Sequence, residues 1–113
     1  MPALNLLFFT LTEKEIDKNF KRRAPGNYIL GNFDSEGDFK VTYVGRSDDD
    51  LIQRLRGHIG SYEIFKAYYA DSANQAFENE CVDYHEINPA DNKAHPARPA
   101  GSDLKCPCCK HFG

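Results

Sequence analysis

The spacing of apolar and polar residues predicts three helices. A capping box at Thr12, where a Thr is followed three residues later by a Glu, predicts a helix that runs to about Lys21. A second helix is expected over residues 51–59, with Ser47 as its cap and three acidic residues at the positive end of the helix dipole. A third helix, opened by another capping box, is expected over residues 72–86.

Strands are expected in three segments rich in alternating or β-branched apolar residues. Residues 27–30 and 39–44 flank a polar turn at 34–38 and form a predicted hairpin, and residues 64–69 form a third strand. The order of elements is helix, two strands, helix, strand and helix, which indicates an α+β domain. Its sheet is expected to be small, mostly antiparallel and three-stranded, with helices flanking it.

The character of the chain changes after residue 88. Four of the six prolines lie in this last segment, and no hydrophobic periodicity continues through it. A long segment without helix or strand is unusual in a small domain unless something holds it in place. The sequence therefore predicts an irregular, Cys- and His-containing C-terminal tail.

Composition restricts the classes of protein to which the chain can belong. Its 14 Lys and Arg against 17 Asp and Glu give a formal net charge of −3, which argues against a protein that coats DNA non-specifically. The apolar run at residues 4–9 is far shorter than the ~20 residues that span a bilayer, and it lacks the flanks of a signal peptide. We expect a cytoplasmic protein with no membrane partner, while the oligomeric state stays open.

One carboxylate stands on the apolar face of the last predicted helix. At about 100° per residue, Glu80 falls among Ala76, Phe77, Cys81 and Tyr84, so it faces either the core or a cleft. An ionised carboxylate buried there needs a partner. Two interpretations stay open: Glu80 forms an ion pair with an Arg across the interface, or it is a metal ligand or acid–base group in a pocket.

Other polar residues gather beside the predicted core. Arg54 and His58 lie one turn apart at the edge of the apolar stripe of the second helix. In the hairpin, Tyr28 and Tyr43 are expected opposite or diagonal to each other on one sheet face. Arg46 follows the second of these strands. Each residue could serve packing or surface solvation alone, but their shared position favours a common cleft.

The ordered set of these residues resembles the GIY-YIG nuclease domain, found in homing endonucleases and in the bacterial excision-repair nuclease. The two signature tripeptides of that family appear here as residues 26–28 (Gly-Asn-Tyr) and 43–45 (Tyr-Val-Gly). The helical Arg of the family, the His one turn later and the metal-binding Glu correspond to Arg54, His58 and Glu80. Each tripeptide alone is a weak signal, whereas the ordered set is much more specific.

The chain departs from the family pattern in two places. Asn27 replaces the usual Ile, which alters a side chain expected to face away from Tyr28. Arg54 lies one residue further from Tyr43 than is common, which implies a longer loop before the helix. This shift leaves open whether Arg46 or Arg54 meets the phosphate.

The resemblance covers residues 26–92 and implies three parts within one compact unit. These are an N-terminal helical extension (1–24), a GIY-YIG-like nuclease domain (25–92) and an irregular tail (93–113). An Asn that often lies beyond the last helix of the family corresponds to Asn92, and its position implies a contact with phosphate.

The activity implied by the resemblance is metal-dependent hydrolysis of phosphodiester bonds in nucleic acid, with DNA as the expected substrate. Glu80 would hold one divalent ion, Mg²⁺ or Mn²⁺, and Arg54 or Arg46 would clamp the phosphate. Tyr43 or Tyr28 would act as the base that activates water, with help from a neighbouring group. The alternative is a non-catalytic nucleic-acid- or protein-binding module, whose signature would be loss of the Glu, the Arg or a Tyr.

The tail carries three of the four cysteines. Cys106 and Cys109 have the C-x-x-C spacing of a zinc knuckle, which in a cytosolic chain favours metal binding over a disulfide. Two further ligands are needed, and the chain offers His85, His95, His111 and Cys108. We favour His85 and His95, because they would tie the tail to the domain. The alternative is a mobile tail with unligated thiols.

Overall fold

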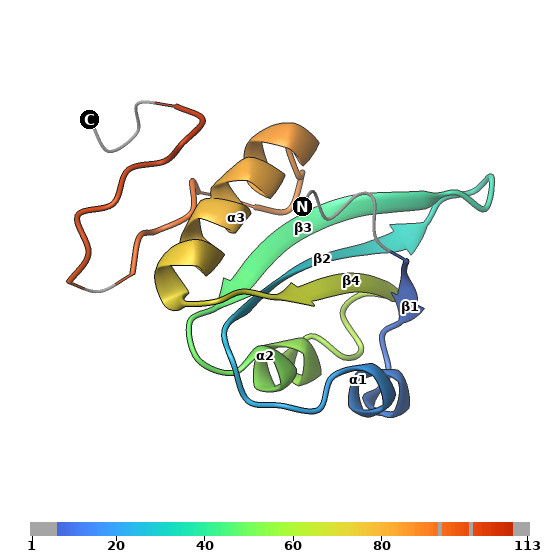
Figure 1. The fold of residues 1–113 in the computed structure, drawn as a ribbon. Helices are drawn as coiled ribbons and strands as arrows, with labels where there is room; N and C mark the ends of the chain where they lie inside the picture. The colour runs from blue at the N-terminus through green and yellow to red at the C-terminus, as the bar shows by residue number, and fades with distance from the viewer. Residues whose placement is uncertain (1–6, 93, 100, 110–113) are drawn as a thin grey trace.

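A central antiparallel sheet separates two layers of helices in the computed structural model (Figure 1). The structure describes residues 7–92, 94–99 and 101–109. In the order in which they lie in the sheet, the strands are β1 (Phe9–Thr10), β4 (Ile64–Tyr69), β2 (Gly26–Phe33) and β3 (Phe39–Ser47). The α+β class and the antiparallel sheet are therefore confirmed, and the bounds of β4 are those predicted.

The sheet has four strands, so the prediction of three was wrong. The additional strand β1 pairs with the edge of β4, with Phe9 opposite Phe65 and Thr10 opposite Ile64. The rings of Phe9 and Phe65 pack with their centroids 5.7 Å apart. A strand of two residues is too short to show an alternating pattern, so the local sequence could not reveal it.

Three helices flank the sheet: α1 (Glu13–Asn19), α2 (Leu51–Gly57) and α3 (Ala73–Ile87). The side chains of Thr12 and Ser72 accept hydrogen bonds from the backbone N–H groups three residues later, which confirms both residues as helix N-caps. The first helix ends two residues before the predicted Lys21. Figure 1 shows α1 and α2 on one face of the sheet and α3 on the other. No helix in the described part of the chain is long and apolar enough to cross a bilayer.

The second helix is shorter than predicted and has a different cap. Asp50, and not the predicted Ser47, caps α2, because its side chain accepts a hydrogen bond from the backbone N–H of Gln53. Ser47 is instead the last residue of β3, opposite Gly26 of β2, and its hydroxyl accepts a hydrogen bond from the N–H of Asp50. The helix ends at Gly57, and Ile59, which was expected in its apolar stripe, is 41% exposed.

The two faces of the sheet carry separate cores. On the side of α1 and α2, the buried core residues are Leu11, Ile16, Phe20, Tyr28, Leu30, Leu51, Leu55 and Phe65. On the side of α3, Ile29 and Val44 pack against Tyr84 and Ile87. Neighbouring residues of β2 alternate between these faces, as the pleat of a strand requires. Leu11, Ile16 and Phe20, which precede position 25, thus belong to the same core as the sheet.

The tail forms no helix or strand over residues 94–99 and 101–109 and passes beside α3 (Figure 1). Cys106 and Leu104 of the tail pack against Phe77 and Cys81 of α3. This contact gives the irregular segment a small apolar anchor. The predicted Cys/His-containing tail is therefore present and packed on the last helix.

Candidate active site

A cavity of about 380 Å³ lies where β2, β3, α2 and α3 meet. Its lining consists of Tyr28, Tyr43, Gly45, Arg46, Asp48, Asp49, Arg54, Glu80 and Ala97. Two Tyr, two Arg and the Glu of this set were predicted for one site. The structure brings these five together from four separate elements.

The absence of a side chain at Gly45 allows the ring of Tyr28 to reach the cavity. Tyr28 and Gly45 are cross-strand partners, and a Cβ on Gly45 would overlap the Tyr28 ring. Tyr43 lies two residues before Gly45 and is therefore diagonal to Tyr28. The two tyrosine rings stack with centroids 6.3 Å apart, which confirms the expected placement on one sheet face.

His58 contacts the cavity indirectly, through Tyr28. It is the C-cap residue of α2, and its Nε2 lies 3.0 Å from the Tyr28 hydroxyl. Burial lowers the pKa of His58, and the charge of Arg54 lowers it further, so the imidazole is neutral at neutral pH. Burial raises the pKa of Tyr28, although Arg54 opposes this shift. The phenol therefore keeps its proton at neutral pH, and its hydroxyl is hydrogen-bonded to a neutral imidazole.

Glu80 forms an ion pair at the cavity wall. Its side chain is almost fully buried, and its Oε1 accepts a hydrogen bond from Nη1 of Arg46 at 2.7 Å. The Arg46 Nε donates to Oδ1 of Asp48, also at 2.7 Å, so one guanidinium lies between two carboxylates. Burial raises the pKa of Glu80, and Arg46 opposes that shift. Glu80 thus pairs with an Arg, as in one interpretation, and faces a cavity, as in the other.

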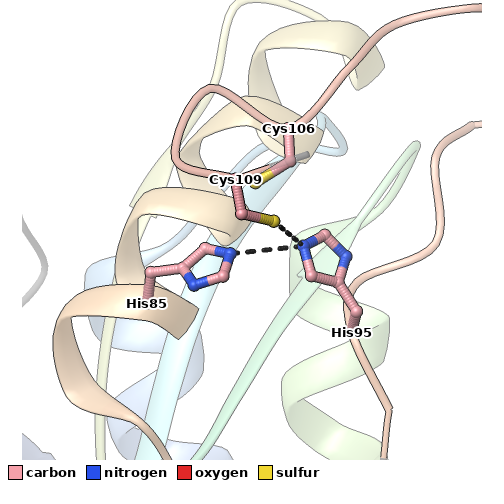
Figure 2. Close-up of side chains that lie close together, drawn as sticks. All are labelled: His85, His95, Cys106 and Cys109. Atoms are coloured by element: carbon pink, nitrogen blue, oxygen red, sulfur yellow. Dashed lines mark hydrogen bonds between the residues drawn. The ribbon is translucent and has the colours of Figure 1, made fainter. Parts of the chain in front are cut away.

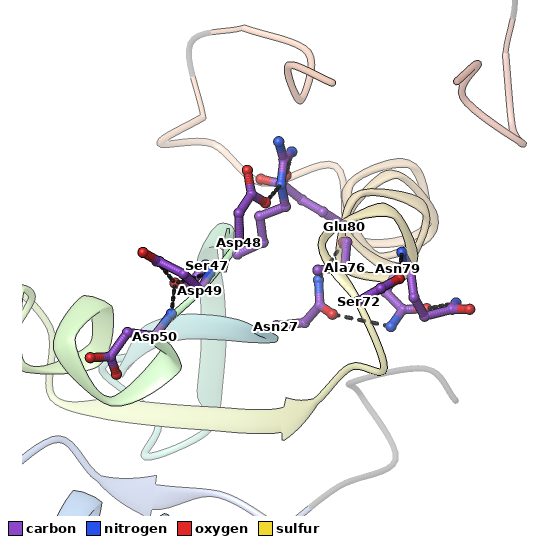
Figure 3. A network of polar contacts seen from close by, with 11 residues as sticks. Asn27, Ser47, Asp48, Asp49, Asp50, Ser72, Ala76, Asn79 and Glu80 are labelled. Carbon is purple, nitrogen blue, oxygen red and sulfur yellow. Dashed lines mark hydrogen bonds and ion pairs between the residues drawn. The ribbon is translucent and has the colours of Figure 1, made fainter. Parts of the chain in front are cut away.

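Asn27 fixes the helix that carries Glu80. Its amide is fully buried on the face opposite Tyr28, as expected for this departure from the family pattern. The Asn27 Nδ2 donates to the carbonyl of Ala76 at 2.8 Å, and its Oδ1 accepts from Nδ2 of Asn79 at 3.1 Å (Figure 3). These bonds hold the first turns of α3 against β2 and so set the position of Glu80.

Three cavity residues escaped the sequence analysis, namely Asp48, Asp49 and Ala97. Asp48 was assigned to the first turn of a helix, whereas it precedes α2 and binds Arg46. The sequence does contain a sign of this contact, because Asp48 follows Arg46 by two residues just beyond the end of a predicted strand. Ala97 reaches the cavity from the tail, and its residue type gives no sign of this position.

Asn92 lies away from the cavity lining. Its Oδ1 accepts a hydrogen bond from the N–H of Val44, and its Nδ2 donates to the Val44 carbonyl, both at 2.9 Å. Both polar ends of the amide are thus engaged with the backbone of β3. The structure does not bring Asn92 to the other predicted residues, and its contact with phosphate stays a prediction.

A second group of chemically active side chains lies between α3 and the tail. One ligand atom from each of its members lies within 4.8 Å of all the others, and the members are His85, His95, Cys106 and Cys109 (Figure 2). This group could hold a metal ion such as zinc, and it is the set that the sequence favoured. Of the alternatives, Cys108 is exposed and outside the group, and His111 lies outside the described residues.

Known proteins give no guide to either site. No family model, no curated protein and no solved structure matches the chain significantly. The functional interpretation therefore depends on the geometry of the cavity and of the Cys/His group, together with the pattern of tripeptides, Arg, His and Glu in the sequence.

Proposed function

We propose that the chain is a divalent-metal-dependent endonuclease of the GIY-YIG type that hydrolyses phosphodiester bonds in nucleic acid, with DNA as the preferred substrate. The observation that carries the proposal is the meeting of two Tyr, two Arg and one nearly buried carboxylate in a single cavity. These residues are scattered over the sequence from position 28 to position 80. Packing alone does not require phenol, guanidinium and carboxylate groups to share an open pocket.

The residues around Glu80 fit a divalent cation. Glu80 and Asp48 both direct a carboxylate oxygen at the same guanidinium, so this corner of the cavity already holds positive charge. Carboxylate oxygens are the protein ligands that Mg²⁺ prefers, and Mn²⁺ takes the same ligands. A bound Mg²⁺ or Mn²⁺ supplies neutralisation of phosphate charge and stabilisation of the leaving oxygen. Arg46 would have to give up its bond to Glu80 for that carboxylate to become a ligand.

The other cavity side chains would bind the phosphate or take part in proton transfer. Arg54 is exposed at the cavity rim, and its guanidinium is suited to grip a phosphate oxygen. Tyr28 would take a proton from the attacking water while it gives its own proton to Nε2 of His58, which lies 3.0 Å from its hydroxyl. Tyr43 stacks on Tyr28 and limits the orientations open to that ring.

The alternative is a non-catalytic nucleic-acid- or protein-binding module on this fold. The Arg46–Glu80 pair favours it, because a carboxylate bound to a guanidinium can be purely structural. Such a module would bind its partner without cleaving it. The two proposals therefore differ in one observable, namely strand breakage.

The deciding experiment is incubation of the protein with plasmid DNA, single-stranded DNA and structured RNA in the presence of Mg²⁺ or Mn²⁺. Cleavage by the wild type should fall by about 10²-fold or more in Glu80→Gln, since the metal accounts for several kcal/mol of transition-state stabilisation. Glu78→Gln, on the same helix but outside the cavity, is the matched control and should cleave normally. Cleavage that Glu80→Gln leaves unchanged, or binding by the wild type without cleavage, would refute the nuclease proposal.

A further inference from the structure

We propose that His85, His95, Cys106 and Cys109 bind one zinc ion in a tetrahedral site, and that this ion fixes the tail against α3. The inference goes beyond the nuclease proposal and does not depend on it. His85 lies in the last turn of α3, and the other three residues lie in the irregular segment that follows (Figure 2). The site would therefore join a helix to a segment that has no helical or strand hydrogen bonding of its own.

The distances between the side-chain atoms match the edges of a zinc tetrahedron. Zn–N bonds of about 2.0–2.1 Å and Zn–S bonds of about 2.3 Å place neighbouring ligand atoms roughly 3.3–3.8 Å apart. The Nε2 atoms of His85 and His95 lie 3.3 Å apart, and Sγ of Cys109 lies 3.4 Å from Nε2 of His95. The whole set lies within 4.8 Å, so little movement would complete the tetrahedron.

The orientation of His95 is that of a metal ligand. Its Nδ1 lies 2.9 Å from the carbonyl oxygen of Pro96, and a carbonyl can only accept a hydrogen bond. Nδ1 therefore carries a hydrogen, which leaves Nε2, the nitrogen that faces His85 and Cys109, as the one that can bind a metal. A carbonyl that fixes the second ring nitrogen in this way is the usual companion of a zinc-bound His.

The two cysteines lie in a turn shaped for thiolates. The backbone N–H of Cys108 points to Sγ of Cys106 at 3.4 Å, a bond that stabilises negative charge on sulfur. Cys106 is buried against Phe77 and Cys81, so one side of the site is apolar and shielded from water. Cys109 is exposed, which leaves a path by which the ion can enter.

A nucleophilic Cys–His pair is the competing chemistry for this group. Cys109 and His95 alone would satisfy it, because such a pair needs one thiol and one base. It would not require His85 and Cys106 to bring their own donor atoms to the same point. Two nitrogens and two sulfurs are the ligand set that selects zinc over the hard cations Mg²⁺ and Ca²⁺.

Zinc at this site would also shape the nuclease cavity. Pro96 is buried directly after His95, and the next residue, Ala97, lines the cavity that contains Glu80. The described tail has no helix or strand to hold Ala97 in position. A zinc bond to His95, two residues away, would supply that restraint.

The test is the zinc content of the full chain, purified without a His-tag. The wild type should retain about one equivalent of zinc, and Cys106→Ser and Cys109→Ser should weaken binding by about 100-fold or more, since even partners of ligands are worth 10–100-fold. Cys108→Ser is the matched control, because this thiol is exposed in the same turn but lies outside the group, and it should retain zinc. Chelation should leave α3 intact and make the peptide bonds of residues 94–109 sensitive to protease.

A measurement on the wild type covers the case in which a variant does not fold. Protein in which Co²⁺ replaces zinc should show the visible bands of tetrahedral cobalt and a thiolate-to-cobalt charge-transfer band. Less than about one-tenth of an equivalent of zinc, with no such spectrum on addition of Co²⁺, overturns the site. Equal loss of zinc from Cys108→Ser and Cys106→Ser overturns this ligand set. Neither readout uses nucleic acid, so failure of the nuclease proposal leaves this test unaffected.

Discussion

The Tyr28 hydroxyl and Nε2 of His58 lie 3.0 Å apart and form a hydrogen bond. The pair joins the middle of the sheet to the end of α2. It gives a buried phenol, whose pKa is raised by burial, a base to which its proton can pass. A Tyr in this position can accept a proton from water without first becoming a free phenolate.

Replacement of Tyr28 by Phe should reduce cleavage by about 10²–10⁴-fold, the usual contribution of proton transfer by a positioned side chain. Tyr43→Phe is the matched control, since that ring lies in the same cavity and stacks on Tyr28. It should lose less than about tenfold in kcat/KM. If Tyr43→Phe were the more damaging change, the base would have to be reassigned to Tyr43.

The pH profile of cleavage should fall on the acid side only. Burial and Arg54 lower the pKa of His58 from its ordinary 6.5, so kcat/KM should decrease as the pH drops through a value below 6.5, where the imidazole gains a proton and stops accepting one. Burial raises the pKa of Glu80, so its protonation adds to the same limb. The raised pKa of Tyr28 predicts no alkaline limb below a pH of about 10.

His58→Gln separates the two titrations, because Gln can still accept a hydrogen bond from Tyr28 but does not titrate. The part of the acid limb that belongs to His58 should disappear in this variant, and the part that belongs to Glu80 should persist. An acid limb of unchanged shape in His58→Gln would show that the imidazole is not the proton acceptor.

Gly45→Ala should damage stability and cleavage together. The new methyl group would overlap the Tyr28 ring and displace it, at a cost of about 1–3 kcal/mol in the free energy of unfolding. Urea unfolding measures that cost. Gly57→Ala is the control, because a Cβ there meets no atom within 4 Å and the residue ends a helix, where Ala is favoured over Gly by up to about 1 kcal/mol. A Gly45→Ala protein as stable and as active as the wild type would contradict the proposed approach of Tyr28.

Asn92→Ala should destabilise the fold by about 1–3 kcal/mol, because it removes both hydrogen bonds to Val44 and leaves part of β3 without its partner. Asn74→Ala, an exposed change at the start of α3, should alter the free energy of unfolding by less than about 0.5 kcal/mol. If Asn92→Ala keeps full stability but loses affinity for nucleic acid, the side chain binds phosphate and does not serve the fold.

Elements that depend on neighbouring residues were predictable, whereas those that depend on distant partners were not. Capping boxes located the starts of α1 and α3, since a cap and its N–H donor are three residues apart. The cap of α2 was misplaced, because four consecutive residues at 47–50 can all cap a helix. The pairing of Ser47 with Gly26, far away in sequence, extends β3 and removes Ser47 from that role.

In the candidate site, too, local features were predictable and contacts between distant residues were not. A helical wheel placed Glu80 on a buried face, but it could not reveal that Arg46, 34 residues away, would be the partner. The members of the Cys/His group were easier to choose, because each is of a residue type that can bind metal and two of them share a C-x-x-C spacing. Asn92 was ambiguous, since an amide can bind a phosphate or a strand backbone and its residue type does not distinguish them.

The segment after α3 has a consequence for how separate copies of the chain behave. Strand β3 is an edge of the sheet. An edge strand with free N–H and C=O groups can pair with a strand of another chain, which leads to aggregation. The side chain of Asn92 is hydrogen-bonded to both the N–H and the C=O of Val44. The N–H of Asp91 donates to the carbonyl of Thr42 at 2.8 Å. An incoming strand would first have to remove these bonds, so the folded chain carries its own protection against edge-to-edge aggregation.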